Sequence, residues 1–250
     1  DWDLFFGVFM TTDRVNHFLY KHYEEDMEYK DEFVEFYRKV DRYLGEIRRN
    51  LPDDVTMMVA SDHGFTSLDY EVHFNQWLAD EGWLSYEDDD HEDLNDISED
   101  AEAYSLIPGR FYINLEGREP RGSVPESEYE AKRDQLKEAL ENLEGPNGRK
   151  VCDRVVEKEE AFHGDHEDIA PDLVAIPNHG FDLKAGFKGH DDVFGHGPRN
   201  GMHSFDNASL FVDDPDATIR DVDLYDIAPT ILDLMEMEYD AGEFDGKSLV

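Results

Sequence analysis

The sequence is poor in cysteine, in basic residues and in long apolar runs. Cys152 is the single cysteine, which excludes both a disulfide framework and a cysteine-based zinc cluster. No apolar run approaches the roughly 18 residues that a membrane-spanning helix needs, and no secretory signal pattern is recognisable. We therefore expect no membrane partner and a cytoplasmic location.

Basic residues are strongly outnumbered. Lys and Arg together number 23 against 62 Asp and Glu, which gives a formal net charge of −39. Such a surplus repels nucleic acid polymers and anionic membranes, so neither is an expected partner. A disordered acidic chain is the alternative, but 39% hydrophobic and 12% aromatic residues argue for a folded core.

This charge predicts adaptation to a high-salt cytoplasm, because the Debye length falls to about 3 Å at molar salt and screens the repulsion. We expect the fold to be lost on dialysis into low-salt buffer, which circular dichroism would report. A chain that stays folded and active in low salt would contradict this expectation.

The pattern of apolar residues indicates an α/β fold. Two apolar runs, at 4–10 and 55–60, are typical of buried strands, and a long helical pattern at about 15–50 joins them. Two strands joined by a helix form a parallel βαβ unit. The other predicted elements are strands at 111–114, 151–162, 172–176 and 210–212, helices at 73–81, 126–143 and 223–235, an acidic loop at 87–100, and a loop or lid at 177–202.

Two polar pairs follow the first apolar runs. Asp13 and His17 are four residues apart, so on a helix their Cβ atoms lie roughly 5–6 Å apart and can hold one divalent ion. A plain surface pair is the simpler alternative. Asp62 and His63 lie on a tight turn before Gly64, where a helix-capping Asp is the alternative. Because ligands collect at the carboxyl ends of parallel strands, we predict that both pairs serve one site.

A later histidine completes the candidate set. His203 precedes a strand-like segment, which suits a side chain aimed at the edge of a sheet. Its spacing does not single it out, because the surrounding region could equally be solvated or bind metal nonspecifically. The neighbouring histidines are His163, His166, His179, His190 and His196.

These residues resemble the type I phosphodiesterase/nucleotide pyrophosphatase branch of the alkaline phosphatase superfamily. The resemblance implies an α/β core with a mainly parallel sheet flanked by helices, formed by residues 1–85 and 181–250. It also implies a small α+β cap-like insertion at 86–180. The matching stretches are 12–17 (TDRVNH), 60–65 (ASDHGF), 110–118 (RFYINLEGR), 170–177 (APDLVAIP), 201–203 (GMH) and 226–232 (DIAPTIL).

The resemblance further implies two divalent ions. Asp13, His17 and His203 would hold one ion. Asp62 and His63 would hold the other, together with an N-terminal Asp and a nucleophilic Ser or Thr. Mixed Asp and His ligands suit Zn²⁺, with Mn²⁺ as a substitute.

The implied activity is metal-dependent hydrolysis of a small phosphodiester or nucleotide, through a covalent intermediate on Ser or Thr. The family places that nucleophile upstream of the Asp13 motif. We therefore expect this chain to be a C-terminal part of the enzyme that lacks the N-terminal part of the core and is inactive alone. A processed chain is the alternative, since the sequence begins without Met.

Rival functions are a phosphomonoesterase, phosphomutase or sulfatase with the same set of metal ligands, and a non-catalytic metal-binding relative.

Overall fold

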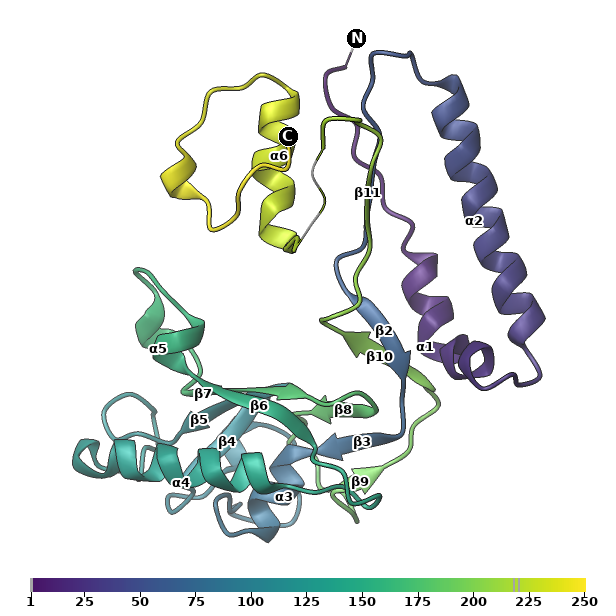
Figure 1. Ribbon diagram of the computed structural model, residues 1–250. Helices are drawn as coiled ribbons and strands as arrows, with labels where there is room; N and C mark the ends of the chain where they lie inside the picture. Colours follow the sequence, from purple (N-terminus) through teal and green to yellow (C-terminus); the bar gives the residue numbers. More distant parts are fainter. Residues whose placement is uncertain (1, 218, 220) are drawn as a thin grey trace. The chain divides into compact units, whose positions relative to one another are not determined.

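The computed structural model describes residues 2–217, 219 and 221–250. The chain divides into two compact units (Figure 1): unit 1 comprises Asp1–Thr66 and His203–Val250, and unit 2 comprises Ser67–Met202. The division falls inside both strands of a two-stranded sheet, β2 (Gly64–Ser67) and β10 (Gly201–Ser204). Each unit is described by itself below.

Unit 1 is built on two helices that lie side by side (Figure 1), α1 (Thr11–Glu24) and α2 (Lys30–Asn50). Phe33 of α2 is buried between them, with the Tyr23 ring stacked on it at 5.0 Å and the Tyr20 ring edge-on at 6.2 Å. The other elements of unit 1 are β1 (Met58–Ala60), β11 (Leu210–Val212), α6 (Ile227–Leu234) and the short 3-10 helices Leu224–Asp226 and Ala241–Glu243.

Unit 2 contains a four-stranded antiparallel sheet of order β4-β5-β7-β6, with α4 (Tyr129–Asn142) packed against it (Figure 1). Leu136 and Leu140 of α4 are fully buried, because they lie four residues apart on the face toward the sheet. The four strands are β4 (Ala103–Ile107), β5 (Arg110–Ile113), β7 (Leu173–Pro177) and β6 (Cys152–Glu157).

A second, three-stranded sheet of unit 2 has β3 (Tyr70–His73) at its centre. β3 pairs parallel with β8 (Phe181–Lys184) and antiparallel with β9 (Phe194–Gly195), and α3 (Phe74–Asp80) follows β3 directly. The remaining elements of unit 2 are α5 (Lys158–Ala161) and the 3-10 helices Leu94–Asp96, Glu126–Glu128 and Glu167–Ile169.

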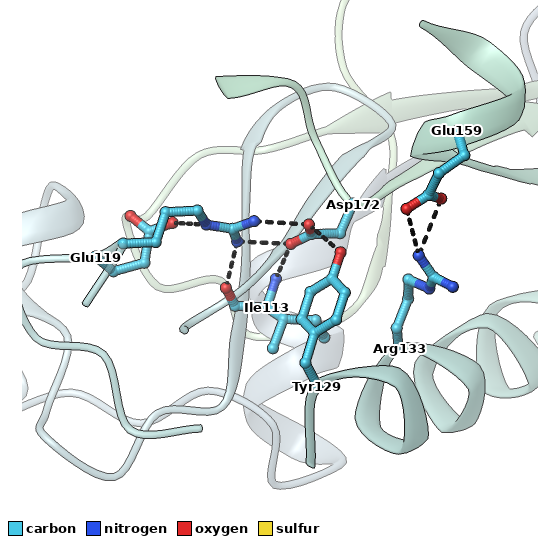
Figure 2. A network of polar contacts seen from close by, with 7 residues as sticks. Ile113, Glu119, Tyr129, Arg133, Glu159 and Asp172 are labelled. Atoms are coloured by element: carbon cyan, nitrogen blue, oxygen red, sulfur yellow. Dashed lines mark hydrogen bonds and ion pairs between the residues drawn. The ribbon is translucent and has the colours of Figure 1, made fainter. Parts of the chain in front are cut away.

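A buried carboxylate ties the elements of unit 2 together. Asp172, just before β7, accepts hydrogen bonds from Arg118 Nη1 and Nη2 at 2.7 Å, from Tyr129 OH at 2.6 Å and from the Ile113 amide at 2.7 Å. Figure 2 shows Tyr129 and Ile113 on either side of this carboxylate. Burial and the hydrogen bond to Asp172 raise the pKa of Tyr129. The network therefore fastens the start of α4 and the end of β5 to β7.

Two predictions for the start of the chain are wrong. Residues 4–10 form no strand, and the Phe5 and Phe6 side chains are 78% and 77% exposed, because this run pairs with no neighbouring strand. The helix expected at about 15–50 is interrupted after Glu24. Asp26 adopts a left-handed backbone (φ 58°) and the Met27 amide donates to the His22 carbonyl, which is the hydrogen bonding of a Schellman helix end.

The prediction of a mainly parallel sheet is not confirmed, since most strand pairings in the described residues are antiparallel. β1 pairs antiparallel with β11 instead of parallel with residues 4–10, although β3 and β8 do pair in parallel. The segment at 177–202 is also not one loop, because it contains β8, β9 and the start of β10.

The remaining element predictions are largely confirmed, with shifted ends; the strand expected at 151–162 stops at Glu157 and continues as α5. The boundaries of the core and cap-like region, and the lack of an N-terminal part of the core, stay predictions. Within the described residues, no helix is long and apolar enough to cross a membrane.

Candidate metal centre

Three segments of unit 1 carry the predicted ligands. Asp13 and His17 lie in the first two turns of α1, where the i, i+4 spacing places both side chains on one face. Asp62 and His63 lie in the turn between β1 and β2, and His203 lies on β10. The sequence pattern therefore correctly placed the first pair on a helix and the second in a turn.

The carboxylate of Asp13 is the centre of the site. Its Oδ1 lies 3.1 Å from Nε2 of His203, 3.6 Å from Nε2 of His17 and 3.9 Å from Nε2 of His63. Ligand atoms of Asp13, His63 and His203 all lie within 4.8 Å of one another. Small side-chain rotations bring such atoms to about 2 Å from a common ion. We call Asp13, His17, His63 and His203 the Asp13 cluster.

The imidazole rings of this cluster pack on one another and on a phenylalanine. The His63 and His203 rings stack with centroids 3.8 Å apart, and the His17 ring lies 4.8 Å from that of His203. Phe65, which is buried, lies with its ring 5.1 to 5.5 Å from all three imidazoles. Phe65 was not among the predicted site residues, although its place directly after Asp62-His63-Gly64 is a usable signal.

A backbone hydrogen bond orients the imidazole of His63. Nδ1 of His63 lies 3.0 Å from the Gly64 carbonyl, which only accepts, so Nδ1 carries the proton. Nε2, the other ring nitrogen, faces Asp13 Oδ1 at 3.9 Å. A backbone carbonyl bonded to Nδ1 is the usual support of a metal-bound histidine, so Nε2 is the nitrogen placed to bind a metal ion.

The environment of His203 also favours the neutral imidazole that metals require. Partial burial lowers the pKa of His203, and the neighbouring His63 and His17 lower it further, while the carboxylate of Asp13 opposes them. An imidazole that is neutral at physiological pH keeps a lone pair free for a metal ion.

Hydrogen bonds between distant segments hold the turn of His63 beside β10. Asn207 Nδ2 donates to the Phe65 carbonyl at 2.8 Å, and its Oδ1 accepts from Ser204 Oγ. Gly64 permits this contact, because a Cβ there would lie 1.5 Å from Asn207 Oδ1. The Ser61 amide also donates to the Ser209 carbonyl at 2.9 Å, so both sides of the turn are fixed.

Asp62 lies at the exposed edge of the site. Its side chain is 81% exposed, and Oδ1 lies 3.6 Å from Nε2 of His63. The structure thus gathers all five predicted ligands in one place, four of them as the Asp13 cluster. His63, which the resemblance pairs with Asp62 on a second ion, also lies close to Asp13 and His203.

A protein-family match covers the segments that carry the five candidate ligands. The profile of the family described as type I phosphodiesterase / nucleotide pyrophosphatase matches residues 1–206, a range that includes every member of the Asp13 cluster and Asp62. No curated protein matches the chain. Because the match covers most of the sequence, the chain belongs to the type I phosphodiesterase/nucleotide pyrophosphatase family.

Proposed function

We propose that this chain carries the metal-binding part of the active site of a phosphodiesterase or nucleotide pyrophosphatase that acts on small phosphodiesters or nucleotides. Family membership supports hydrolysis of this general kind. The observation that carries the proposal is the Asp13 carboxylate oxygen, which faces the imidazole nitrogens of His17, His63 and His203.

The donor set fits divalent zinc, with manganese as the alternative. One carboxylate and three imidazoles are ligands of the type that Zn²⁺ prefers, and the bond from Nδ1 to the Gly64 carbonyl leaves Nε2 of His63 as the nitrogen placed to bind the ion. We assign Asp13, His17 and His203 to one ion, and Asp62 and His63 to a second. Two such ions supply charge neutralisation at a transferring phosphoryl group and lower the pKa of a nucleophilic hydroxyl.

The residues of the chain have distinct tasks in this proposal. Asp13 compensates the positive charge that the imidazoles bind, and the Gly64 carbonyl orients His63 through Nδ1. Phe65 shields one side of the imidazoles from water, which strengthens electrostatic interactions inside the site. Asp62, being exposed, is free to turn toward an incoming ion. We propose that hydrolysis proceeds through a phosphoryl or nucleotidyl group held covalently on a Ser or Thr hydroxyl.

We also propose that residues 86–180 form an inserted cap-like region, and that the protein works in a high-salt cytoplasm. The net charge of −39 supports the second part, since molar salt screens it.

Metal content measured together with hydrolysis tests the proposed function. The chain, kept in molar salt, is analysed for bound Zn and Mn and assayed with bis-p-nitrophenyl phosphate and p-nitrophenyl phosphate. We expect bound metal, and we expect any turnover to be faster with the diester than with the monoester. Faster cleavage of the monoester would favour a phosphomonoesterase, whereas bound metal without turnover is the result expected of a part of the enzyme that is inactive alone. A chain that binds no metal would overturn the proposal.

A further inference from the structure

Unit 2 has a pocket of about 350 Å³ that the proposed hydrolytic site does not use. Its polar lining comes from β3 and from the segment that leads into and past β9. The polar residues are Glu71, His73, His190, Asp191, Asp192 and His196. Imidazoles and carboxylates are thus gathered a second time, outside the Asp13 cluster.

The centre of this pocket is a stacked histidine pair. The rings of His73 and His190 lie with centroids 3.6 Å apart and 16° between their planes. This arrangement resembles the pair in the Asp13 cluster, where His63 and His203 stack at 3.8 Å and 25°. Two imidazoles whose centroids are this close can both turn a ring nitrogen toward one ion.

The backbone at 195–197 lies close against the side chains of Glu71 and His73. Glu71 and His73 share one face of β3, because Val72 between them is fully buried on the other. A Cβ at Gly195 would lie 2.9 Å from His73 Nε2, and a Cβ at Gly197 would lie 2.6 Å from Glu71 Oε1. Glycine at both positions therefore lets the segment at 195–197 lie directly against the two side chains.

The charge of the pocket selects a cation. Glu71, Asp191 and Asp192 contribute carboxylates, and Lys184 Nζ, 3.5 Å from Glu71 Oε1, offsets only one of them. A site that combines imidazole with carboxylate favours borderline transition ions such as Zn²⁺, whereas Mg²⁺ and Ca²⁺ prefer oxygen ligands alone.

We propose that this pocket is a second metal site, separate from the Asp13 cluster, in which His73 and His190 bind a divalent ion of the zinc class. Within the described part of the chain, only the Asp13 cluster already brings three ligand atoms within 4.8 Å. Here the third ligand is the carboxylate of Asp191 or Asp192, whose exposed side chains rotate at little cost. The bound ion fastens the segment that carries His190 to β3.

Zinc stoichiometry tests this site. The full chain is dialysed against Zn²⁺ in molar KCl and analysed for metal, beside a His73→Gln/His190→Gln variant. We expect that variant to bind one ion fewer. The matched control is His163→Gln/His166→Gln, which removes two exposed histidines of the same unit and should lose none. Equal stoichiometry in the three proteins, or an equal loss in the control, would overturn the proposal.

Two further variants keep the test decisive. If circular dichroism shows that the histidine variant misfolds, Asp191→Asn/Asp192→Asn replaces it, because both side chains are exposed and the stacked rings stay in place. We expect that variant to bind Zn²⁺ at this site at least about 10-fold more weakly; unchanged affinity would overturn the proposal. His17→Gln changes only the Asp13 cluster and should leave zinc binding at the second site unchanged. The experiment therefore distinguishes failure of the second site from failure of the Asp13 cluster.

Discussion

Asp13→Asn is expected to weaken zinc binding at the Asp13 cluster by more than about 100-fold, since losing even a group that only supports a metal ligand costs 10- to 100-fold. The substitution keeps the shape of the side chain but removes the charge that faces His17, His63 and His203. Hydrolysis of bis-p-nitrophenyl phosphate should fall with the bound metal. Isothermal titration with Zn²⁺ in molar KCl measures the affinity, and the diesterase assay measures the consequence.

The matched control is Asp41→Asn, which removes the same charge from an exposed position on α2. Asp13 also lies in the first turn of α1, where its charge favours the helix by about 0.3–1 kcal/mol, too little to unfold unit 1. Asp41→Asn should therefore bind zinc like the unaltered chain. If Asp13→Asn keeps its affinity within a few-fold, or if both variants weaken alike, Asp13 is not a ligand.

The sequence predicts the ligands better than it predicts how they meet. Asp13 and His17 are found by helical spacing, and Asp62 and His63 by their turn, because both signals are local. The meeting of His63 with His203 depends on contacts such as the hydrogen bond from Asn207 to Phe65, whose residues lie 142 positions apart. No local pattern encodes such a contact, so only the family resemblance selected His203 from its histidine-rich surroundings.

The errors in the predicted fold also arise from contacts between residues that are far apart in the sequence. Residues 4–10 have the composition of a strand, but a strand also needs a neighbour to receive its hydrogen bonds, and composition does not report one. The direction of β1 depends on its pairing with β11, which lies far along the chain. The end of α1 has no helpful local signal either, because the three consecutive acidic residues Glu24 to Asp26 are unfavourable at a helix C-terminus, and the helix nevertheless ends at Glu24.

The second histidine pair shows what periodicity misses. The region at 177–202 has little apolar periodicity, so its sequence predicts a loop. Its short strands β8 and β9 are specified by their pairing with β3, which brings the segment that carries His190 back to His73. A histidine-rich loop and a polar strand end thus become one pocket only through tertiary structure.

Asp172→Ala is expected to destabilise unit 2 by about 3–5 kcal/mol, the usual cost of removing one partner of a buried ion pair. The Asp172 side chain is 1% exposed and is the acceptor for Arg118, Tyr129 and the Ile113 amide (Figure 2). Its removal leaves Arg118 with Glu119, 2.9 Å from Nε, as its remaining carboxylate partner in the network, and deprives the Ile113 amide and the Tyr129 hydroxyl of their acceptor. Urea denaturation in molar salt, followed by circular dichroism, measures the loss in free energy of unfolding.

A second ion pair in the same region provides the control. Arg133 Nη1 lies 3.0 Å from Glu159, whose side chain is 53% exposed, so Glu159→Gln should cost less than about 1 kcal/mol. Both variants remove one carboxylate charge, but Asp172→Ala also deletes a buried acceptor, whereas Glu159→Gln keeps a polar amide at an exposed position. If Asp172→Ala is as mild as Glu159→Gln, Arg118 must find water or another acceptor, and Asp172 does not fasten α4 and β5 to β7. A large difference instead locates much of the stability of unit 2 in a single buried carboxylate, in a protein whose other carboxylates mostly face solvent.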